Sequence, residues 1–214
     1  MTLHYVDQRT PEWFALRLGR LTASDAKDML ATIKSGEAAA RRDLRMRLVC
    51  ERLIGQSVED TTFQNADMQR GIDLEPEARR AYEAHTGHLV DTSVGFMSRD
   101  DCAAGCSPDG VIDVTGLVEI KCPRPARHVG YLKAGSVPPE HRAQLVHQLW
   151  VAGPDAQWVD FVSYCPQLPA HLQLFIVRLE RDEQEIAAYA AKARAFLDEV
   201  DTEVEALLRL KEQR

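Results

Sequence analysis

Residues 106–123, CSPDGVIDVTGLVEIKCP, contain two acids and a lysine at a spacing that could support chemistry. Glu119 and Lys121 alternate with apolar residues, as the polar positions of a β-strand with one buried face would. Asp109 precedes the glutamate by ten residues and follows a Ser-Pro pair. This pattern is either a salt-bridged surface strand or part of a reactive site, and the surrounding SPDG and EIKCP sequences favour the site.

The loop length of the predicted hairpin decides which side chains share a face. A two-residue loop would turn Asp109 away from Glu119, whereas a three-residue loop, with Gly116 in the left-handed conformation, pairs Asp113 with Leu117. The second register places both carboxylates and the lysine on one face. It also creates an opposite apolar face, made of Ile112, Val114, Val118 and Ile120. The apolar alternation therefore favours the three-residue loop.

Two carboxylates on one face repel each other unless a cation lies between them. Mg²⁺ is bound by one or two carboxylates together with the phosphate of a substrate. Lys121 could orient or deprotonate an attacking water, or stabilise charge that develops on a phosphate. The pattern Asp109, Glu119, Lys121 therefore indicates phosphodiester hydrolysis.

The elements that must position these residues can be read from helical and strand periodicity. Thr10 is a candidate N-cap and Gly19 a C-terminal stop for a first helix, and Ser24 is a candidate N-cap for a second. We expect further helices at about 37–53, at 65–87 with a kink at Pro76, at 138–153 and from Asp182 onward. Strand-like segments are 88–98, 109–122, 156–165 and 172–180.

This order of elements predicts an α/β fold with a central mixed β-sheet flanked by helices. The last segment has apolar residues near helical spacing, from Ile186 to Leu207, and we expect it to form one long amphipathic helix that covers the sheet. A length of 214 residues suits a single domain spanning residues 1–214.

Charge and cysteine content narrow the class of protein. The net charge of −7 argues, taken alone, against a nucleic-acid partner, but arginines cluster at Arg41 to Arg47 and again around Arg124. These arginines are either a solvated helix face or a DNA-facing stripe. Five cysteines without a CxxC pair indicate reduced, buried thiols more than a metal centre. No secretory signal or apolar run of about 20 residues is present, so we expect a cytoplasmic protein without a membrane partner.

The segments CSPDG and GLVEIKCP resemble those of the phage lambda exonuclease or YqaJ-like viral recombinase family, in the PD-(D/E)XK nuclease superfamily. Three further segments resemble the family in the same order along the chain. They are WFALRLGRLTAS, GIDLEPEARRAYEAHTG and AQLVHQLWVAG. The resemblance covers most of the chain and implies a restriction-endonuclease-like core.

The resemblance also implies roles for individual residues. Asp109 and Glu119 would be metal ligands, completed by the backbone carbonyl of Ile120, and Lys121 would be the catalytic lysine. Glu75 would supply a helix carboxylate to the metal site. Its neighbour Glu77 fits that helix face less well, and Pro76 directly after Glu75 departs from the pattern.

Other residues would contact the DNA. Gln144 would border the catalytic site from its helix. Arg17, Ser24 and Ser107 match a pocket for a terminal 5′-phosphate, although an ordinary helix cap and a surface charge are the plain alternatives for Ser24 and Arg17. We count Arg41, Arg45 and Arg124 as further candidate DNA contacts.

The implied activity is a Mg²⁺-dependent 5′-to-3′ exonuclease, with Mn²⁺ as a substitute, that degrades one strand of linear double-stranded DNA to mononucleotides. The resemblance further implies a ring-shaped homotrimer, phage or prophage origin and a single-strand annealing protein as partner in recombination. The alternatives are an endonuclease of the same superfamily and a DNA-end-binding subunit that does not cut.

Overall fold

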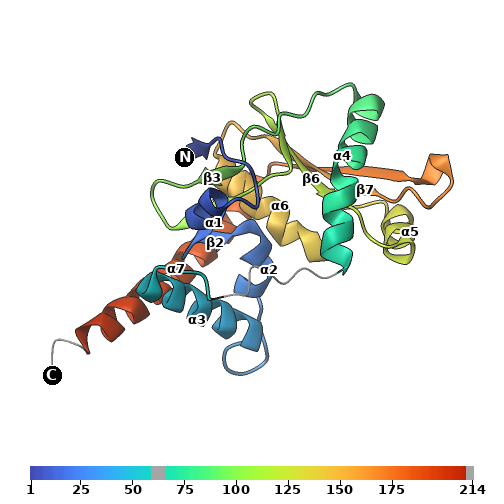
Figure 1. The fold of residues 1–214 in the computed structure, drawn as a ribbon. Helices are drawn as coiled ribbons and strands as arrows, with labels where there is room; N and C mark the ends of the chain where they lie inside the picture. The colour runs from blue at the N-terminus through green and yellow to red at the C-terminus, as the bar shows by residue number, and fades with distance from the viewer. Residues whose placement is uncertain (59–65, 211–214) are drawn as a thin grey trace.

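The computed structural model describes residues 1–58 and 66–210 of the chain and contains two four-stranded mixed sheets surrounded by helices (Figure 1). The first sheet has the order β1-β3-β4-β2, with strands Thr2–His4, Phe96–Ser98, Ala104–Cys106 and Leu21–Thr22. The second has the order β5-β6-β7-β8, with strands Gly110–Ile112, Gly116–Lys121, Trp158–Tyr164 and Leu174–Glu180. The α/β class is confirmed, and the strands form two sheets where the sequence suggested a single central one.

Seven α-helices and two short 3₁₀ helices are found in the described residues. The helices are α1 (Pro11–Arg17), α2 (Ala26–Met29), α3 (Ala39–Ile54), α4 (Ala66–Thr86), α5 (Pro125–Ala134), α6 (Pro139–Ala152) and α7 (Glu183–Arg209), with η1 (Ala23–Asp25) and η2 (Ala170–Leu172). Asn65, where the predicted fourth helix began, lies outside the described residues. Helix α4 continues through Pro76 and ends before Gly87, whose φ of +77° suits a left-handed C-terminal stop.

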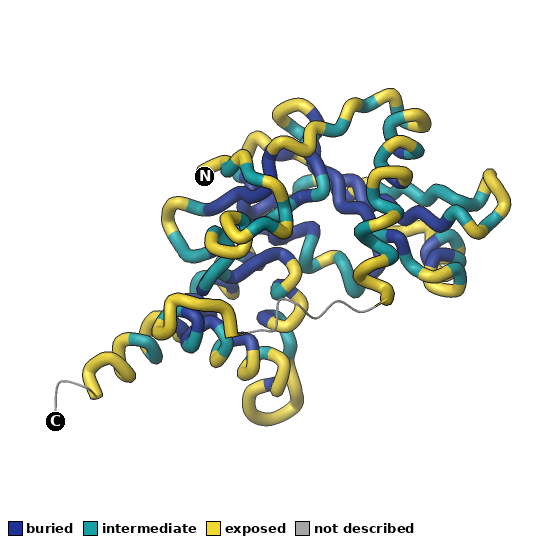
Figure 2. The backbone as a smooth tube through the Cα atoms, viewed as in Figure 1, coloured by how far each residue is buried: buried dark blue, intermediate teal, exposed yellow. Residues whose placement is uncertain are grey.

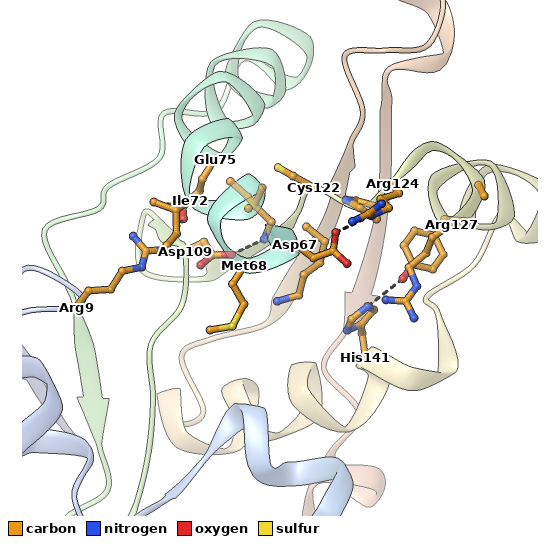
Figure 3. Close-up of a pocket in the computed structure, with 16 residues that line it drawn as sticks. Arg9, Asp67, Met68, Ile72, Glu75, Asp109, Cys122, Arg124, Arg127 and His141 are labelled. Carbon is orange, nitrogen blue, oxygen red and sulfur yellow. Dashed lines mark hydrogen bonds and ion pairs between the residues drawn. The ribbon is translucent and has the colours of Figure 1, made fainter. Parts of the chain in front are cut away.

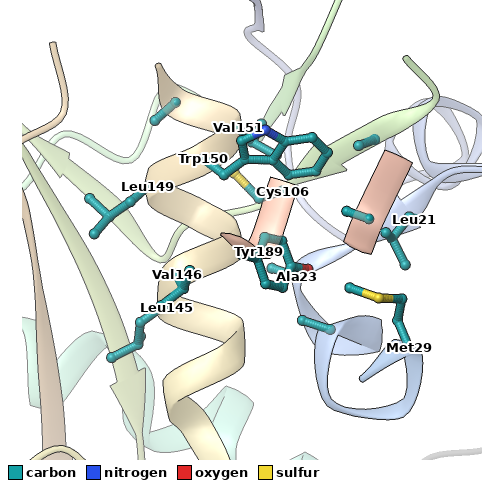
Figure 4. Close-up of a cluster of buried hydrophobic side chains, with 14 of the residues drawn as sticks. Leu21, Ala23, Met29, Cys106, Leu145, Val146, Leu149, Trp150, Val151 and Tyr189 are labelled. Carbon is teal, nitrogen blue, oxygen red and sulfur yellow. The ribbon is translucent and has the colours of Figure 1, made fainter. Parts of the chain in front are cut away.

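The second sheet is packed between α6 on one face and α4 on the other. Alternate residues of β6 divide between two hydrophobic clusters, with Leu117 in the cluster that includes α6, and Val118 and Ile120 in the cluster that includes α4. Helix α6 is buried from Leu145 onward, and Figure 2 shows buried backbone at the centre of the molecule, where α6, β6 and β7 lie. Figure 4 shows Trp150 and Tyr189 packed together in the larger cluster.

Helix α7 packs mainly against α3 and α6, which differs from the expectation that it covers a sheet. Its N-cap is Asp182, and its buried stripe is made of Ile186, Tyr189, Ala193, Phe196, Leu197 and Val200. Toward its end the helix extends away from the body and becomes more exposed (Figures 1 and 2). In the described part of the chain, no helix is both long and apolar enough to cross a membrane.

The hairpin between β5 and β6 has a different register from the predicted one but the predicted facing. Ile112 pairs with Gly116, and Asp113, rather than Gly116, takes the left-handed conformation with φ of +50°. A glycine is required at position 116 by packing and not by backbone conformation, because a Cβ there would lie 2.3 Å from the Trp158 ring. The register differs from the prediction by two residues, so the same side chains share a face, except that Val114 lies exposed in the turn.

Local capping explains how the first helices begin. Thr10 caps α1 as predicted, since its hydroxyl accepts a hydrogen bond from the Trp13 amide at 3.3 Å. The predicted cap Ser24 is wrong. The capping residue is Thr22, which forms a capping box with Asp25, so the Ser24 hydroxyl is available for other contacts.

Candidate active site

Strand β5 pairs with β6 only at residues 116–118, so Glu119 and Lys121 lie on the part of β6 that extends beyond β5. Asp109 immediately precedes β5, and its amide donates to the Val118 carbonyl at 3.0 Å. Its carboxylate oxygen Oδ2 then accepts the Ile120 amide at 2.6 Å. The Asp109 side chain therefore takes the place of the missing strand along this edge of β6.

Glu119 is buried and is held at both carboxylate oxygens. Lys121 Nζ and Gln144 Nε2 donate to Oε1, the latter at 2.5 Å. Gln148 Nε2 donates to Oε2, also at 2.5 Å. The two glutamines lie one turn apart on α6, so a single helix fixes the orientation of the carboxylate.

The charges in this cluster shift one another's pKa values. Burial, and then the nearby Glu119 carboxylate, raise the pKa of Asp109 well above its ordinary value, although Lys121 opposes this. For Lys121, burial acts to lower the pKa, but Glu119 and Asp109 outweigh it and the pKa is raised. Lys121 is therefore a protonated cation at neutral pH in this state, which suits charge stabilisation and water positioning better than proton abstraction.

An open pocket of about 730 Å³ lies in front of the cluster (Figure 3). Helix α4 supplies Glu75 to its wall, held by Arg9 Nη2 at 3.2 Å and by Arg79 Nη2 at 2.9 Å. Glu77 accepts a hydrogen bond from the Tyr164 hydroxyl at 2.6 Å and does not line the pocket. The sequence-based preference for Glu75 over Glu77 is thus consistent with the geometry.

The opposite wall of the pocket is basic and aromatic. Arg127, Tyr131 and His141 line it, and Tyr131 and His141 share a hydrogen bond of 3.1 Å. Burial, reinforced by the Lys121 charge, lowers the pKa of His141 to about 4. His141 is therefore neutral at physiological pH and can accept or donate a hydrogen bond.

The donor set at this edge suits a hard divalent cation. Asp109 and Glu119 contribute carboxylate oxygens, and burial together with the neighbouring Glu119 charge raises the pKa of Asp109. The Ile120 amide points to the Asp109 side of the strand, so the carbonyl of the same residue faces that side too. Within residues 1–58 and 66–210, no group of three His, Cys, Asp or Glu side chains is already assembled as a metal cluster. Glu75 would therefore have to leave its arginine partners to join a metal site.

Arg17, Ser24 and Ser107 are brought together beside this site. Arg17 Nη1 lies 3.5 Å from Ser107 Oγ and its Nη2 lies 3.4 Å from Thr22 Oγ1, which in turn contacts Ser24 Oγ at 3.0 Å. Trp13 supports the group, because its indole N–H donates to Ser107 Oγ at 2.8 Å and its ring packs 4.2 Å from the Arg17 guanidinium. We call Arg17, Thr22, Ser24 and Ser107 the hydroxyl–arginine cluster.

The remaining predicted DNA contacts do not gather with these residues. Arg41 and Arg45 lie on α3, where both pair with Glu37 and with acids of α7, Arg41 with Glu199 and Arg45 with Glu203. These partners neutralise the arginine stripe, and the plain alternative of a solvated, ion-paired face describes it better. Arg124 does line the pocket, and it pairs with Asp67 at 2.7 Å.

Sequence reasoning missed three residues that belong to the site. Of the two α6 glutamines only Gln144 was predicted, and neither Thr22 nor Arg9 was. A signal existed for Gln148, because its spacing of four from Gln144 places both on one helix face. Arg9 carried no such signal, because its contact with Glu75 spans 66 residues of sequence.

A mixed sheet that presents Asp109, Glu119 and Lys121 beside an open pocket is the arrangement expected of a PD-(D/E)XK-type nuclease. Comparison with family models agrees, since the YqaJ-like viral recombinase domain matches residues 12–155. The chain belongs to this family. A comparison with curated proteins gave no match.

Solved structures support the same assignment. The chain is similar to LHK-Exo, an alkaline exonuclease from Laribacter hongkongensis, at 40% identity, with 95% of this chain and 99% of that one covered and a TM-score of 0.85. LHK-Exo in complex with dAMP gives the same identity and coverage and a TM-score of 0.86. A phage-related exonuclease from Haemophilus somnus 129PT shares the fold at 13% identity, with a TM-score of 0.67 over 88% of this chain and 96% of that one. The predicted family and fold are confirmed, and the relatives agree with an exonuclease.

Proposed function

We propose that this protein is a metal-dependent exonuclease that degrades one strand of linear double-stranded DNA from its 5′ end. The observation that carries the proposal is the closeness of two groups along the chain. Ser107 belongs to the hydroxyl–arginine cluster and Asp109, two residues later, belongs to the carboxylate site. A terminal phosphate bound at the cluster would leave the next phosphodiester near the carboxylates, which is the arrangement an end-directed nuclease needs.

Mg²⁺ is the cofactor that we propose, with Mn²⁺ as a substitute, because every candidate ligand is an oxygen atom. Asp109, Glu119 and the Ile120 carbonyl would hold the ion, with Glu75 as a further carboxylate. When bound, such an ion lowers the pKa of water and stabilises charge on phosphate oxygens. We propose that it also offsets the burial and the Glu119 repulsion that raise the pKa of Asp109.

The chain's own residues would orient the reaction. Lys121, protonated and anchored to Glu119, would stabilise the negative charge that develops on the scissile phosphate and position the attacking water. Gln144 and Gln148 would keep the Glu119 carboxylate from rotating. Neutral His141 and Tyr131 would form the far wall of the pocket and hydrogen-bond to the nucleotide.

The hydroxyl–arginine cluster would set the polarity. Arginine binds phosphate with two donors, and hydroxyls add further hydrogen bonds. Ser107 Oγ accepts from Trp13 and Arg17, which leaves its own hydrogen to donate to an anion. A terminal 5′-phosphate captured here would allow stepwise release of mononucleotides and leave a 3′ single-stranded overhang.

We further propose phage or prophage origin, a ring-shaped homotrimer and action beside a single-strand annealing protein in recombination. These proposals rest on the family. A ring would reconcile the net charge of −7 with DNA binding, because only the inner channel has to be basic.

The proposal is tested with linear duplex DNA that carries a labelled 5′-phosphate, incubated with Mg²⁺ or with EDTA. We expect labelled mononucleotide to be released only with the metal and faster than from a 5′-hydroxyl control. Cleavage of closed circular DNA would instead indicate an endonuclease. Binding to DNA ends with no release under any condition would indicate an end-binding subunit that does not cut.

A further inference from the structure

Arg9 occupies an unusual backbone conformation at the edge of the pocket. Its φ is +70°, in the left-handed region that residues with a Cβ rarely adopt outside Asn and Asp. Such a conformation is strained and persists only where the surroundings impose it. A long, charged side chain at such a position is a reason to look for a function.

The surroundings of Arg9 fix its backbone from both sides. Before it, Gln8 Nε2 donates to the Pro108 carbonyl at 3.0 Å, next to Asp109. After it, Thr10 caps α1 and its hydroxyl also donates to the Asp7 carbonyl at 2.8 Å. The turn therefore directs Arg9 into the pocket, where Figure 3 shows it beside Asp109 and Glu75.

The ion pair between Arg9 and Glu75 does not by itself explain this arrangement. Glu75 already has a partner on its own helix, because Arg79 donates to it at 2.9 Å with the favourable spacing of four residues. The Arg9 contact is longer, at 3.2 Å, and the Arg9 side chain is 45% exposed whereas that of Arg79 is 24% exposed. Arg9 is thus the outer and more accessible of the two arginines.

The position of Arg9 relates it to the proposed path of the DNA strand. Three consecutive residues join the two groups. Ser107 belongs to the hydroxyl–arginine cluster, the Pro108 carbonyl accepts a hydrogen bond from Gln8, and Asp109 belongs to the carboxylate site. Arg9 lies beside this stretch, at the opposite end of the pocket from Arg127 and His141 (Figure 3). A strand that enters from the cluster would meet its guanidinium on the way to the carboxylates.

We propose that Arg9 is a DNA-binding residue that exchanges Glu75 for a phosphate oxygen of the strand being degraded. Glu75 holds the guanidinium in the free protein, and the phosphate replaces that carboxylate when DNA enters. The exchange leaves Glu75 with Arg79 and makes it more available to the metal site. This inference rests on the proposed function and adds a phosphate contact to it.

The test measures binding of a blunt 5′-phosphorylated duplex in EDTA, where no cutting occurs, by fluorescence anisotropy over a range of salt concentrations. We expect Arg9→Gly to raise the Kd about tenfold and to reduce the slope of log K against log salt by about 0.7 to 0.9, the effect of losing one phosphate contact. Arg9→Asn, which also tolerates the left-handed conformation, should behave alike, and Arg9→Lys should recover part of the affinity.

Arg79→Gln is the matched control, because it removes the other partner of Glu75 and leaves Arg9 in place. In EDTA, we expect its Kd to stay within twofold of the wild-type Kd and its salt slope to equal the wild-type slope within experimental error. If Arg79→Gln and Arg9→Gly weakened DNA binding equally, both arginines would act through Glu75. That result would overturn the proposed direct contact between Arg9 and a phosphate. A wild-type Kd and salt slope for Arg9→Gly would overturn it too.

Thermal unfolding separates this result from a folding defect. Glycine suits a φ of +70°, so Arg9→Gly should unfold at a temperature equal to or above that of the wild type. A lower unfolding temperature would contradict the claim that the conformation is retained for function. If the wild type digests DNA while Arg9→Gly binds normally, only the role of Arg9 fails, whereas a wild type that releases no nucleotide with Mg²⁺ refutes the proposed function itself.

Discussion

Gln148 Nε2 lies 2.5 Å from Glu119 Oε2, and this hydrogen bond joins a fully buried amide to a buried carboxylate. Among the described residues, no donor lies within hydrogen-bond reach of the Gln148 side-chain oxygen. A buried polar atom without a partner costs about 1–3 kcal/mol. Because the oxygen of Gln148 gains no hydrogen bond here, the bond from its amide nitrogen to Glu119 is what offsets the burial of this side chain.

We expect Gln148→Leu to lower activity while keeping the fold. The change leaves the buried Glu119 Oε2 without its donor, which costs about 1–3 kcal/mol, but it also removes the unpartnered Gln148 oxygen, so we expect a smaller net loss of stability. Loss of a residue that orients a metal ligand typically costs about 10-fold to 100-fold in metal affinity or activity. A titration of nuclease rate against Mg²⁺ concentration, with unfolding in urea as the control, checks this. An unchanged Mg²⁺ dependence would show that Gln148 does not position Glu119.

The raised pKa of Asp109 predicts how the stability of the metal-free protein depends on pH. Its pKa is raised in the folded protein, by burial first and by Glu119 next, so the folded state binds a proton more tightly than the unfolded state. Stability is consequently lost as the pH rises above about 4, the unfolded value, and through the folded pKa. We expect Asp109→Asn to unfold at a higher temperature than the wild type at pH 7 and to lose that advantage at pH 3.

Metal binding provides the control for that experiment. Mg²⁺ should raise the unfolding temperature of the wild type, because a ligand that binds only the folded state stabilises it, and should raise that of Asp109→Asn less. A shift of about 2–4 °C corresponds to each kcal/mol for a chain of this size. Equal Mg²⁺ shifts for both proteins would place the ion away from Asp109.

The buried Asp160 anchors helix α4, which carries Glu75. Its Oδ2 accepts the Tyr82 hydroxyl at 2.7 Å, and Arg178 donates to both oxygens at 2.8 and 2.9 Å while stacking on Trp158. We expect Tyr82→Phe to reduce the free energy of unfolding in urea by about 1–3 kcal/mol, because a bond to a buried charge is lost.

The exposed pair of Arg42 and Asp43 is the control for Tyr82→Phe. Surface pairs contribute little, so Arg42→Ala should change the free energy of unfolding by less than about 1 kcal/mol. Equal effects of the two substitutions would show that the Tyr82–Asp160 bond does not anchor α4.

Arg17 and Arg45 separate the two groups of predicted DNA contacts. We expect Arg17→Ala to remove the preference for a 5′-phosphate over a 5′-hydroxyl end, with a loss of about 10-fold to 100-fold in rate on the phosphorylated end. Arg45 is paired with Glu37 and Glu203, so Arg45→Ala should keep that preference. Rates on matched labelled duplexes measure both. A lost preference in Arg45→Ala alone would reverse the assignment.

Local sequence signals predicted the elements well but not their long-range packing. Periodicity placed α3, α6 and α7 within a few residues, and the alternation around Glu119 predicted which hairpin side chains share a face. The hairpin register was wrong because Gly116 was taken as a turn residue, whereas Trp158, which packs against it, lies on a strand 42 positions later. No local pattern carries that contact.

The same reasoning explains the other differences. The apolar stripe of α7 predicted that one face of this helix would be buried. It did not predict that α3 and α6 would cover that face, because a helix that packs on a helix and one that packs on a sheet have the same apolar pattern. Arg41 and Arg45 gave the same sequence signal as a DNA-binding stripe, and only the position of Glu199 and Glu203 on α7 distinguishes the two. Asp109, Glu119 and Lys121 lie together as predicted, because their shared face follows from the local alternation of the hairpin alone.

The central claim is that Glu119, Asp109 and Lys121 together cut DNA, and Lys121→Ala tests it most directly. The measurement is release of mononucleotide from a 5′-labelled duplex with Mg²⁺, beside the Kd for the same duplex in EDTA. The account predicts a fall of about 10²–10³ in the cleavage rate with the Kd kept within a few-fold, because the lysine stabilises charge that develops during the reaction. Wild-type cleavage by Lys121→Ala would contradict the account.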